Sequence, residues 1–167
     1  MLNEDGMVYD DGVTTRLDEN HYVMTTTTGG AANVMGKLED YLQTEWPELD
    51  VYLTSVTDHF ATISVCGPKS KKVLSKVIPD LDFSDENFPH MSFKNTKISK
   101  INCRVMRISF TGEQSYEINI QANFGESLWE KCMQAGEEFN ITPYGTETMH
   151  LLRAEKGFII VGQDTDG

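Results

Sequence analysis

The sequence predicts an α+β fold in which antiparallel sheets pack against helices. Segments with apolar residues at helical spacing alternate along the chain with short segments that are rich in β-branched residues. Residues 101–110 and 116–120 also alternate between apolar and polar side chains, and a polar turn containing Gly112 separates them. That pattern indicates a β-hairpin, which makes at least one sheet antiparallel.

The amino-terminal third is expected to hold a hairpin and a helix. Residues 13–17 read as a strand, and the threonine-rich residues 21–28 read as the strand that returns beside it. Two glycines follow. Residues 31–42 then carry apolar side chains at the spacing of an amphipathic helix, which should end before Trp46-Pro47.

The middle of the chain alternates again, and its order suggests a ferredoxin-like unit. The helix that follows it should be capped by Thr146 and ended by Gly157. From residue 49 on, the expected elements are strands at 49–57 and 60–66, a helix at 70–77, a polar loop at 79–89, a weakly extended stretch at 91–99, the hairpin, a helix at 124–138, a short strand at 141–144 and a helix at 146–156.

This order divides the chain into three segments. Residues 1–48 form part of one domain, residues 49–145 form the ferredoxin-like unit, and residues 146–167 return to the first domain. The first six residues and the final GQDTDG both look like turns that lead elsewhere, so we expect an internal segment of a longer polypeptide.

Composition excludes several classes of function. The formal net charge of −12 disfavours binding to nucleic acid or to an anionic membrane surface, because both would repel it. No apolar run has membrane-spanning length, and no amino-terminal segment resembles a signal peptide. Cys66, Cys103 and Cys132 lack CxxC spacing, which predicts reduced thiols in a cytoplasmic protein without a metal site.

Spacing alone gives no catalytic signature. The sequence contains no P-loop, GxGxxG, HExxH or GxSxG motif. Asp10 and Asp11 are adjacent, so on a strand at most one of them could enter a given pocket. From the residues alone, this pair and the charges at Glu113 and Glu117 fit solvated surface positions.

Three ordered segments nevertheless resemble the aminomethyltransferase family, which includes the T-protein of glycine cleavage. MLNEDGMVYDDGV resembles the family stretch in which MLN precedes a glycine turn and paired aspartates. RISFTGEQSYEINI resembles its YTGExGYEI segment, and LLRAEKGFIIVGQDTD resembles its LRLEAG segment. The resemblance implies a partial folate-binding domain of that family.

Further runs are similar to one branch of the family, the alpha subunits of heterotetrameric sarcosine oxidases. These runs are DDGVTTRL, TTTTGGAA, LQTEWPELDVYLTSVTDHFATISVCGPK and ITPYGTETMHLLRAEKG. The resemblance implies that tetrahydrofolate captures the one-carbon unit of sarcosine as 5,10-methylenetetrahydrofolate, while glycine and hydrogen peroxide are released. It also implies FAD, FMN and NAD elsewhere in the complex, and beta, gamma and delta subunits as partners. A segment alone is expected to be inactive and to bind folate weakly or not at all.

The same resemblance assigns site residues. Asp10 falls on the family's key aspartate, which implies proton transfer near the folate nitrogens. Glu117 falls on the glutamate that binds the pterin. Phe110 takes the place of a tyrosine and could stack but not donate a hydrogen bond, and Thr27 replaces an asparagine near the ligand. Arg153 falls on the family arginine and would anchor either the site or an ion pair with Glu155.

Two alternatives remain open. One is a demethylating enzyme that acts on dimethylglycine, or a T-protein proper; Thr27 in place of asparagine disfavours a lipoyl-protein reaction. The other is a folate-binding scaffold without catalysis, with which Asp10 and Glu117 are equally compatible. A flavin-containing partner would favour the enzyme.

Overall fold

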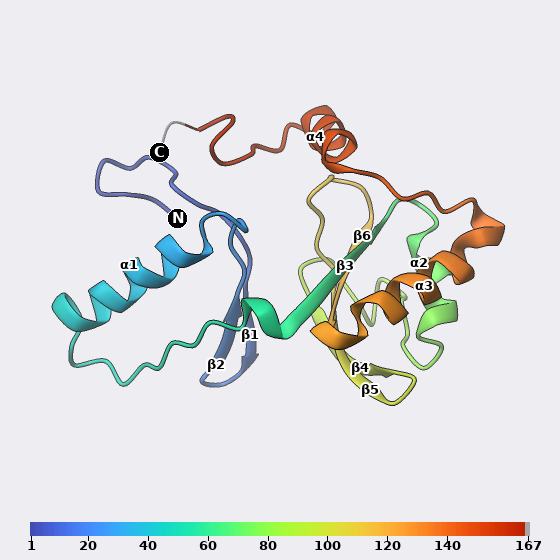
Figure 1. Cartoon of the computed structure of the whole chain (residues 1–167), viewed down its shortest axis with the longest axis horizontal. Helices are drawn as coiled ribbons and strands as arrows, with labels where there is room; N and C mark the ends of the chain where they lie inside the picture. The colour runs from blue at the N-terminus through green and yellow to red at the C-terminus, as the bar shows by residue number, and fades with distance from the viewer. Residues whose placement is uncertain (166–167) are drawn as a thin grey trace. The chain divides into compact units, whose positions relative to one another are not determined.

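A computed structural model describes residues 1–165 of the chain (Figure 1). These residues form two compact units. The first contains Met1–Ser55 together with residues 159–165, and the second contains Val56–Phe158. The boundaries expected from the sequence, at residues 48 and 145, stay a prediction.

The first unit contains the predicted hairpin and helix. Strands β1 (Thr14–Asp18) and β2 (His21–Met24) pair antiparallel. The return strand ends at Met24, short of the expected residue 28, and Thr27 beyond it binds the carboxylate of Asp10. Helix α1 (Ala31–Thr44) follows, and it begins where the sequence predicted.

Four strands form the sheet of the second unit, in the order β3-β6-β5-β4, and every neighbouring pair is antiparallel. The strands are β3 (Phe60–Cys66), β4 (Phe93–Ile98), β5 (Ile101–Met106) and β6 (Ser115–Gln121). The helices are α2 (Ser70–Val77), α3 (Gly125–Gly136) and α4 (Thr146–Glu155). The 3-10 turns are η1 (Thr57–His59), η2 (Ala122–Phe124) and η3 (Glu137–Phe139).

The predicted ferredoxin-like unit is wrong in its element order. Such a unit runs β-α-β-β-α-β, whereas the second unit runs β3-α2-β4-β5-β6-α3. The stretch at 91–99 holds the full strand β4, which pairs with β5 along its length. Residues 141–144 form no strand, and Pro143 there could not donate to a ladder. Residues 49–56 form no strand either, because no described segment pairs with them.

Side-chain alternation gives the sheet of the second unit two different faces. One face is apolar and packs against α2 and α3, which lie together on one side of the sheet in Figure 1. We call the opposite side the polar face. It presents Thr62, Ser64, Cys66, Arg104, Ser115, Glu117 and Asn119, as their pairing across β3, β6 and β5 requires.

The predicted polar loop at residues 79–89 has an apolar underside. Phe83 is 5% exposed and Phe88 is fully buried. Both rings pack on Tyr116 of β6, with centroids 5.3 Å and 5.6 Å from its ring. The loop is therefore attached to the core through two aromatic side chains.

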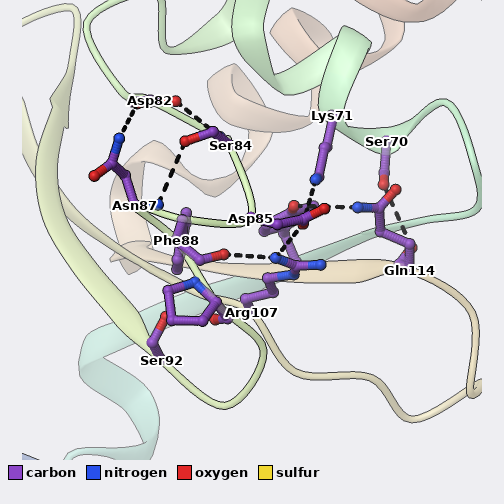
Figure 2. Close-up of polar contacts among 12 residues, drawn as sticks. Ser70, Lys71, Asp82, Ser84, Asp85, Asn87, Phe88, Ser92, Arg107 and Gln114 are labelled. Atoms are coloured by element: carbon purple, nitrogen blue, oxygen red, sulfur yellow. Dashed lines mark hydrogen bonds and ion pairs between the residues drawn. The ribbon is translucent and has the colours of Figure 1, made fainter.

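Ion pairs cover the outside of this loop, as Figure 2 shows. The Asp85 carboxylate lies 2.6 Å from Lys71 Nζ and 2.6 Å from an Arg107 nitrogen. Arg107 also donates a hydrogen bond to the Phe88 carbonyl at 2.6 Å. Because Asp85 is 74% exposed, these pairs are screened by solvent.

The last helix, α4, departs from the sequence-based expectation at its start and agrees with it at its end. Gly145, and not Thr146, is the N-cap residue of α4, and no side chain caps the helix. At the other end Gly157 adopts φ of 75°, the left-handed conformation that the sequence predicted for a terminating glycine.

Candidate functional site

Asp10 is a buried carboxylate in the first unit, with 1% of its surface exposed. Its Oδ1 accepts the Thr27 backbone N–H at 2.9 Å, and its Oδ2 accepts the Thr27 hydroxyl at 2.9 Å. The solvated turn expected from the residues alone is therefore wrong for Asp10, although Asp11 is exposed. The structure brings together two of the predicted site residues, and Thr27 holds Asp10 in place.

Gly30 completes this arrangement at the start of α1. Its N–H donates to the Thr27 hydroxyl oxygen at 3.0 Å. A Cβ atom at residue 30 would lie 1.6 Å from Asp10 Oδ2, so only glycine fits. The amino end of the helix carries partial positive charge, which favours a carboxylate there. A carboxylate offers about four acceptor positions, and Thr27 takes only two of them, so Asp10 can accept further hydrogen bonds.

Glu117 lies on the polar face of the second unit. In the sheet it stands opposite Ser64 of β3 and opposite Met106 of β5. Burial raises the pKa of the Glu117 carboxyl above its ordinary value. Within residues 1–165 its carboxylate accepts no side-chain hydrogen bond and joins no ion pair. A half-buried carboxylate with open acceptor positions suits a ligand that brings N–H donors.

A tyrosine hydroxyl reaches the same face of the sheet. The Cys66 thiol donates to the Tyr144 hydroxyl oxygen at 3.3 Å, and the Ser64 and Ser115 hydroxyl oxygens are 3.2 Å apart. Burial raises the pKa of Tyr144 to about 12, with Cys66 and Glu117 adding to the rise and Ser64 opposing it. The Tyr144 hydroxyl thus contacts the face of the sheet that also carries Glu117.

Sequence reasoning missed Tyr144, Cys66 and Ser64. All three lie in runs that are similar to sarcosine oxidase alpha subunits, but the resemblance assigned them no role, and Tyr144 lies 78 residues from its partner Cys66. The available signal was the polar alternation of residues 60–66, which places Ser64 and Cys66 on the same side of a strand. That signal does not show that Ser64 and Cys66 lie near Glu117, because this depends on the pairing of β3 with β6.

Phe110 and Arg153 also belong to the second unit. Phe110 is 42% exposed in the segment between β5 and β6, where its ring is accessible for stacking. Arg153, in the last turn of α4, donates to the Phe158 carbonyl at 2.9 Å. The guanidinium thus fixes the backbone just beyond the helix.

The turn around Gly112 packs against the end of α4. Gly112 has φ of 75°, and a Cβ there would lie 2.3 Å from Lys156 Cγ. Lys156 Nζ is 2.9 Å from a Glu113 carboxylate oxygen. Gly112 therefore serves the turn, as predicted, and Glu113 is an ion-pair partner rather than a site residue.

The predicted site residues fall in different units. Asp10 and Thr27 belong to the first unit, and Glu117, Phe110 and Arg153 belong to the second. In the part of the chain that the structure describes, no three His, Cys, Asp or Glu side chains gather as metal ligands would. None of the described helices combines the length and the apolar character that a membrane span needs.

Comparison with known proteins identifies relatives along the whole chain. The family model for the GCVT N-terminal domain matches residues 1–167. Sarcosine oxidase subunit alpha from Corynebacterium sp. (strain P-1) is 60% identical over all of this chain, which spans 17% of the relative's length. The corresponding subunit from Rhizobium meliloti is 45% identical over 95% of this chain. The chain spans 16% of that subunit's length. Aminomethyltransferase from Thermoanaerobacter sp. is 30% identical over 98% of the chain, and 43% of that protein is covered.

A solved structure supports the same relationship. A chain of heterotetrameric sarcosine oxidase from Corynebacterium sp. U-96, in complex with pyrrole 2-carboxylate, matches with a TM-score of 0.52 and 25% identity. The match covers 65% of this chain and 54% of that chain. The mixed α+β architecture with antiparallel sheets is thus shared with a sarcosine oxidase structure.

Proposed function

Because this chain belongs to the GCVT N-terminal domain family, we propose that it is the tetrahydrofolate-binding portion of a sarcosine oxidase alpha subunit. The observation that carries the proposal is the half-buried Glu117 carboxylate with open acceptor positions, in a chain 60% identical to such a subunit. Identity to the aminomethyltransferase and to dimethylglycine dehydrogenase is 30%, which favours the sarcosine oxidase branch over both.

Glu117 is the proposed anchor for the pterin. The 2-amino-4-oxo edge of a pterin offers two parallel N–H donors, and a carboxylate can accept both. The two charge-assisted hydrogen bonds would compensate the burial that raises the pKa of this carboxyl. Phe110, exposed in the segment between β5 and β6, would add a stacking surface.

Asp10 is the proposed proton carrier. Bound tetrahydrofolate would supply the nitrogen atoms that take up the one-carbon unit. The Asp10 carboxylate, fixed by Thr27 and by the amino end of α1, keeps acceptor positions from which it can take and return a proton. Thr27 would act through Asp10, since its hydroxyl is already committed to that carboxylate. Arg153 would stabilise the segment after α4 or anchor a folate carboxylate.

The remaining chemistry would lie outside this chain. Oxidation of sarcosine, with release of hydrogen peroxide and glycine, needs flavin cofactors that we assign to other parts of a complex with beta, gamma and delta subunits. The one-carbon product would leave as 5,10-methylenetetrahydrofolate.

Titration with 5-formyltetrahydrofolate tests the folate site. We expect this chain to bind the ligand weakly, because it spans 17% of the length of its relatives, so ligand-observed NMR is the suitable measurement. Glu117→Ala should abolish binding, whereas Glu130→Ala, at an exposed carboxylate of α3, should leave it unchanged. Wild-type binding that survives Glu117→Ala would contradict the proposal.

A further inference from the structure

The geometry next to Glu117 supplies a hydrogen-bond donor that the proposed function does not yet use. Ser64 stands directly opposite Glu117 in the β3–β6 ladder, and Cys66 stands opposite Ser115. Directly opposite side chains of an antiparallel pair lie about 4.5–5.5 Å apart at Cβ. The Cys66 contact therefore holds the Tyr144 hydroxyl over β3, on the same face as the Glu117 carboxylate.

The Tyr144 hydroxyl has a hydrogen to give. In the described residues it accepts from the Cys66 thiol, and its other hydrogen-bonding neighbour is the Ser64 hydroxyl, which can donate as well as accept. A thiol is a weak donor and acceptor, so this contact positions the hydroxyl without satisfying it. A phenol is protonated at neutral pH, and burial raises the pKa of Tyr144 further, so the hydroxyl can act as a donor there.

Glu117 and Tyr144 together present two acceptors beside one donor. A pterin edge presents the complement, because its two N–H donors stand next to the carbonyl oxygen at carbon 4. A carboxylate alone would bind any ligand with two parallel N–H groups, whereas the added hydroxyl selects for the neighbouring oxygen.

We propose that Tyr144 is a specificity-determining residue that donates its hydroxyl hydrogen to the 4-oxo group of the pterin bound at Glu117. The inference rests on the proposed function and adds to it a residue that recognises the oxygen. Cys66 is a positioning residue in this arrangement, since it touches the hydroxyl and not the ligand.

The test is NMR titration of this chain with 5-formyltetrahydrofolate carrying ¹³C at carbons 2 and 4. In the wild type, the carbon 4 resonance should move downfield on binding, as a carbonyl that accepts a hydrogen bond does. In Tyr144→Phe the carbon 4 shift should shrink, the carbon 2 shift should persist, and the dissociation constant should rise roughly tenfold. Cys66→Ala should weaken binding less, and Tyr22→Phe, at an exposed tyrosine of β2, should have no effect.

The outcomes separate the two claims. If the wild type binds and Tyr144→Phe binds with the same affinity and the same carbon 4 shift, the role of Tyr144 is overturned and the folate site is left standing. Weaker binding with an unchanged carbon 4 shift would reduce Tyr144 to a structural residue and also overturn the role. Absence of a wild-type response at either carbon, both in this chain and in a complete sarcosine oxidase, would overturn the folate site, and this inference with it.

Discussion

At the scale of single residues, the Asp10 carboxylate depends on one neighbour. Thr27→Val keeps the backbone N–H that binds Oδ1 and removes the hydroxyl, which donates to Oδ2 and accepts the Gly30 N–H. Since a hydrogen bond to a charged group contributes about 1.5–3 kcal/mol, the free energy of unfolding should fall by at least that amount in urea denaturation. Thr28→Val, at an exposed neighbour, should change it little. Equal losses in both variants would show that the hydroxyl bond is not the cause.

Glu117 should make stability depend on pH. Burial raises the pKa of its carboxyl in the folded state, so the folded protein binds the proton more tightly than the unfolded chain does. Stability is then lost as the pH rises from the unfolded pKa through the folded one. Glu117→Gln should therefore be more stable than the wild type at pH 8, and the difference should disappear near pH 4. Urea denaturation at both pH values measures this, and a constant difference would contradict the pKa direction.

The sequence identifies some of these residues and not others. Asp10 and Glu117 fall in segments that resemble a family, so their positions could be carried over. Tyr144 also falls in a matching run, but its contact with Cys66 could not be predicted, because it joins residues 78 apart and depends on the fold of the whole second unit. Burial of Asp10 was also invisible in the sequence, because it depends on the chain returning at Thr27.

At the scale of elements, residues 79–89 show which interactions hold a loop. Phe88 is fully buried, whereas the Asp85 ion pairs are mostly exposed. Phe88→Ala should therefore cost about 3–5 kcal/mol of the free energy of unfolding. Asp85→Asn should produce a much smaller change, because solvent screens exposed pairs. Chemical denaturation of both variants decides this, and a larger loss for Asp85→Asn would reverse the ranking.

Elements with a strong local pattern were predicted best. The helix at 31–42, the helix at 70–77 and the strand at 60–66 appear within two residues of their expected bounds. The strand expected at 49–57 failed, because β-branched residues form a strand only where another strand pairs with them. Strand β4 was expected only as a weakly extended stretch, because its lysines and asparagine have low strand propensity. It forms a full strand because β5 pairs with it along its whole length.

At the scale of the whole molecule, this chain would be one part of a larger enzyme, and its residues should affect one step selectively. In the complete sarcosine oxidase, Asp10→Ala should slow formation of 5,10-methylenetetrahydrofolate by about a hundredfold or more. Sarcosine oxidation, measured as hydrogen peroxide release, should change little, because we assign the flavins to other parts of the complex. Asp11→Ala is the matched control at an exposed carboxylate. Equal loss of both activities in Asp10→Ala would refute the assignment.

The contacts of Asp10 and of Tyr144 span very different lengths of chain, and this has a consequence for when each forms. Asp10 meets Thr27 across 17 residues, within reach of a single hairpin and the start of a helix. Tyr144 meets Cys66 across 78 residues, a span that contains β6 and α3. Because local contacts close faster than distant ones, the carboxylate proposed to carry the proton should be in place early during folding. The hydroxyl proposed to recognise the ligand should arrive late, and a partly folded chain would hold the first without the second.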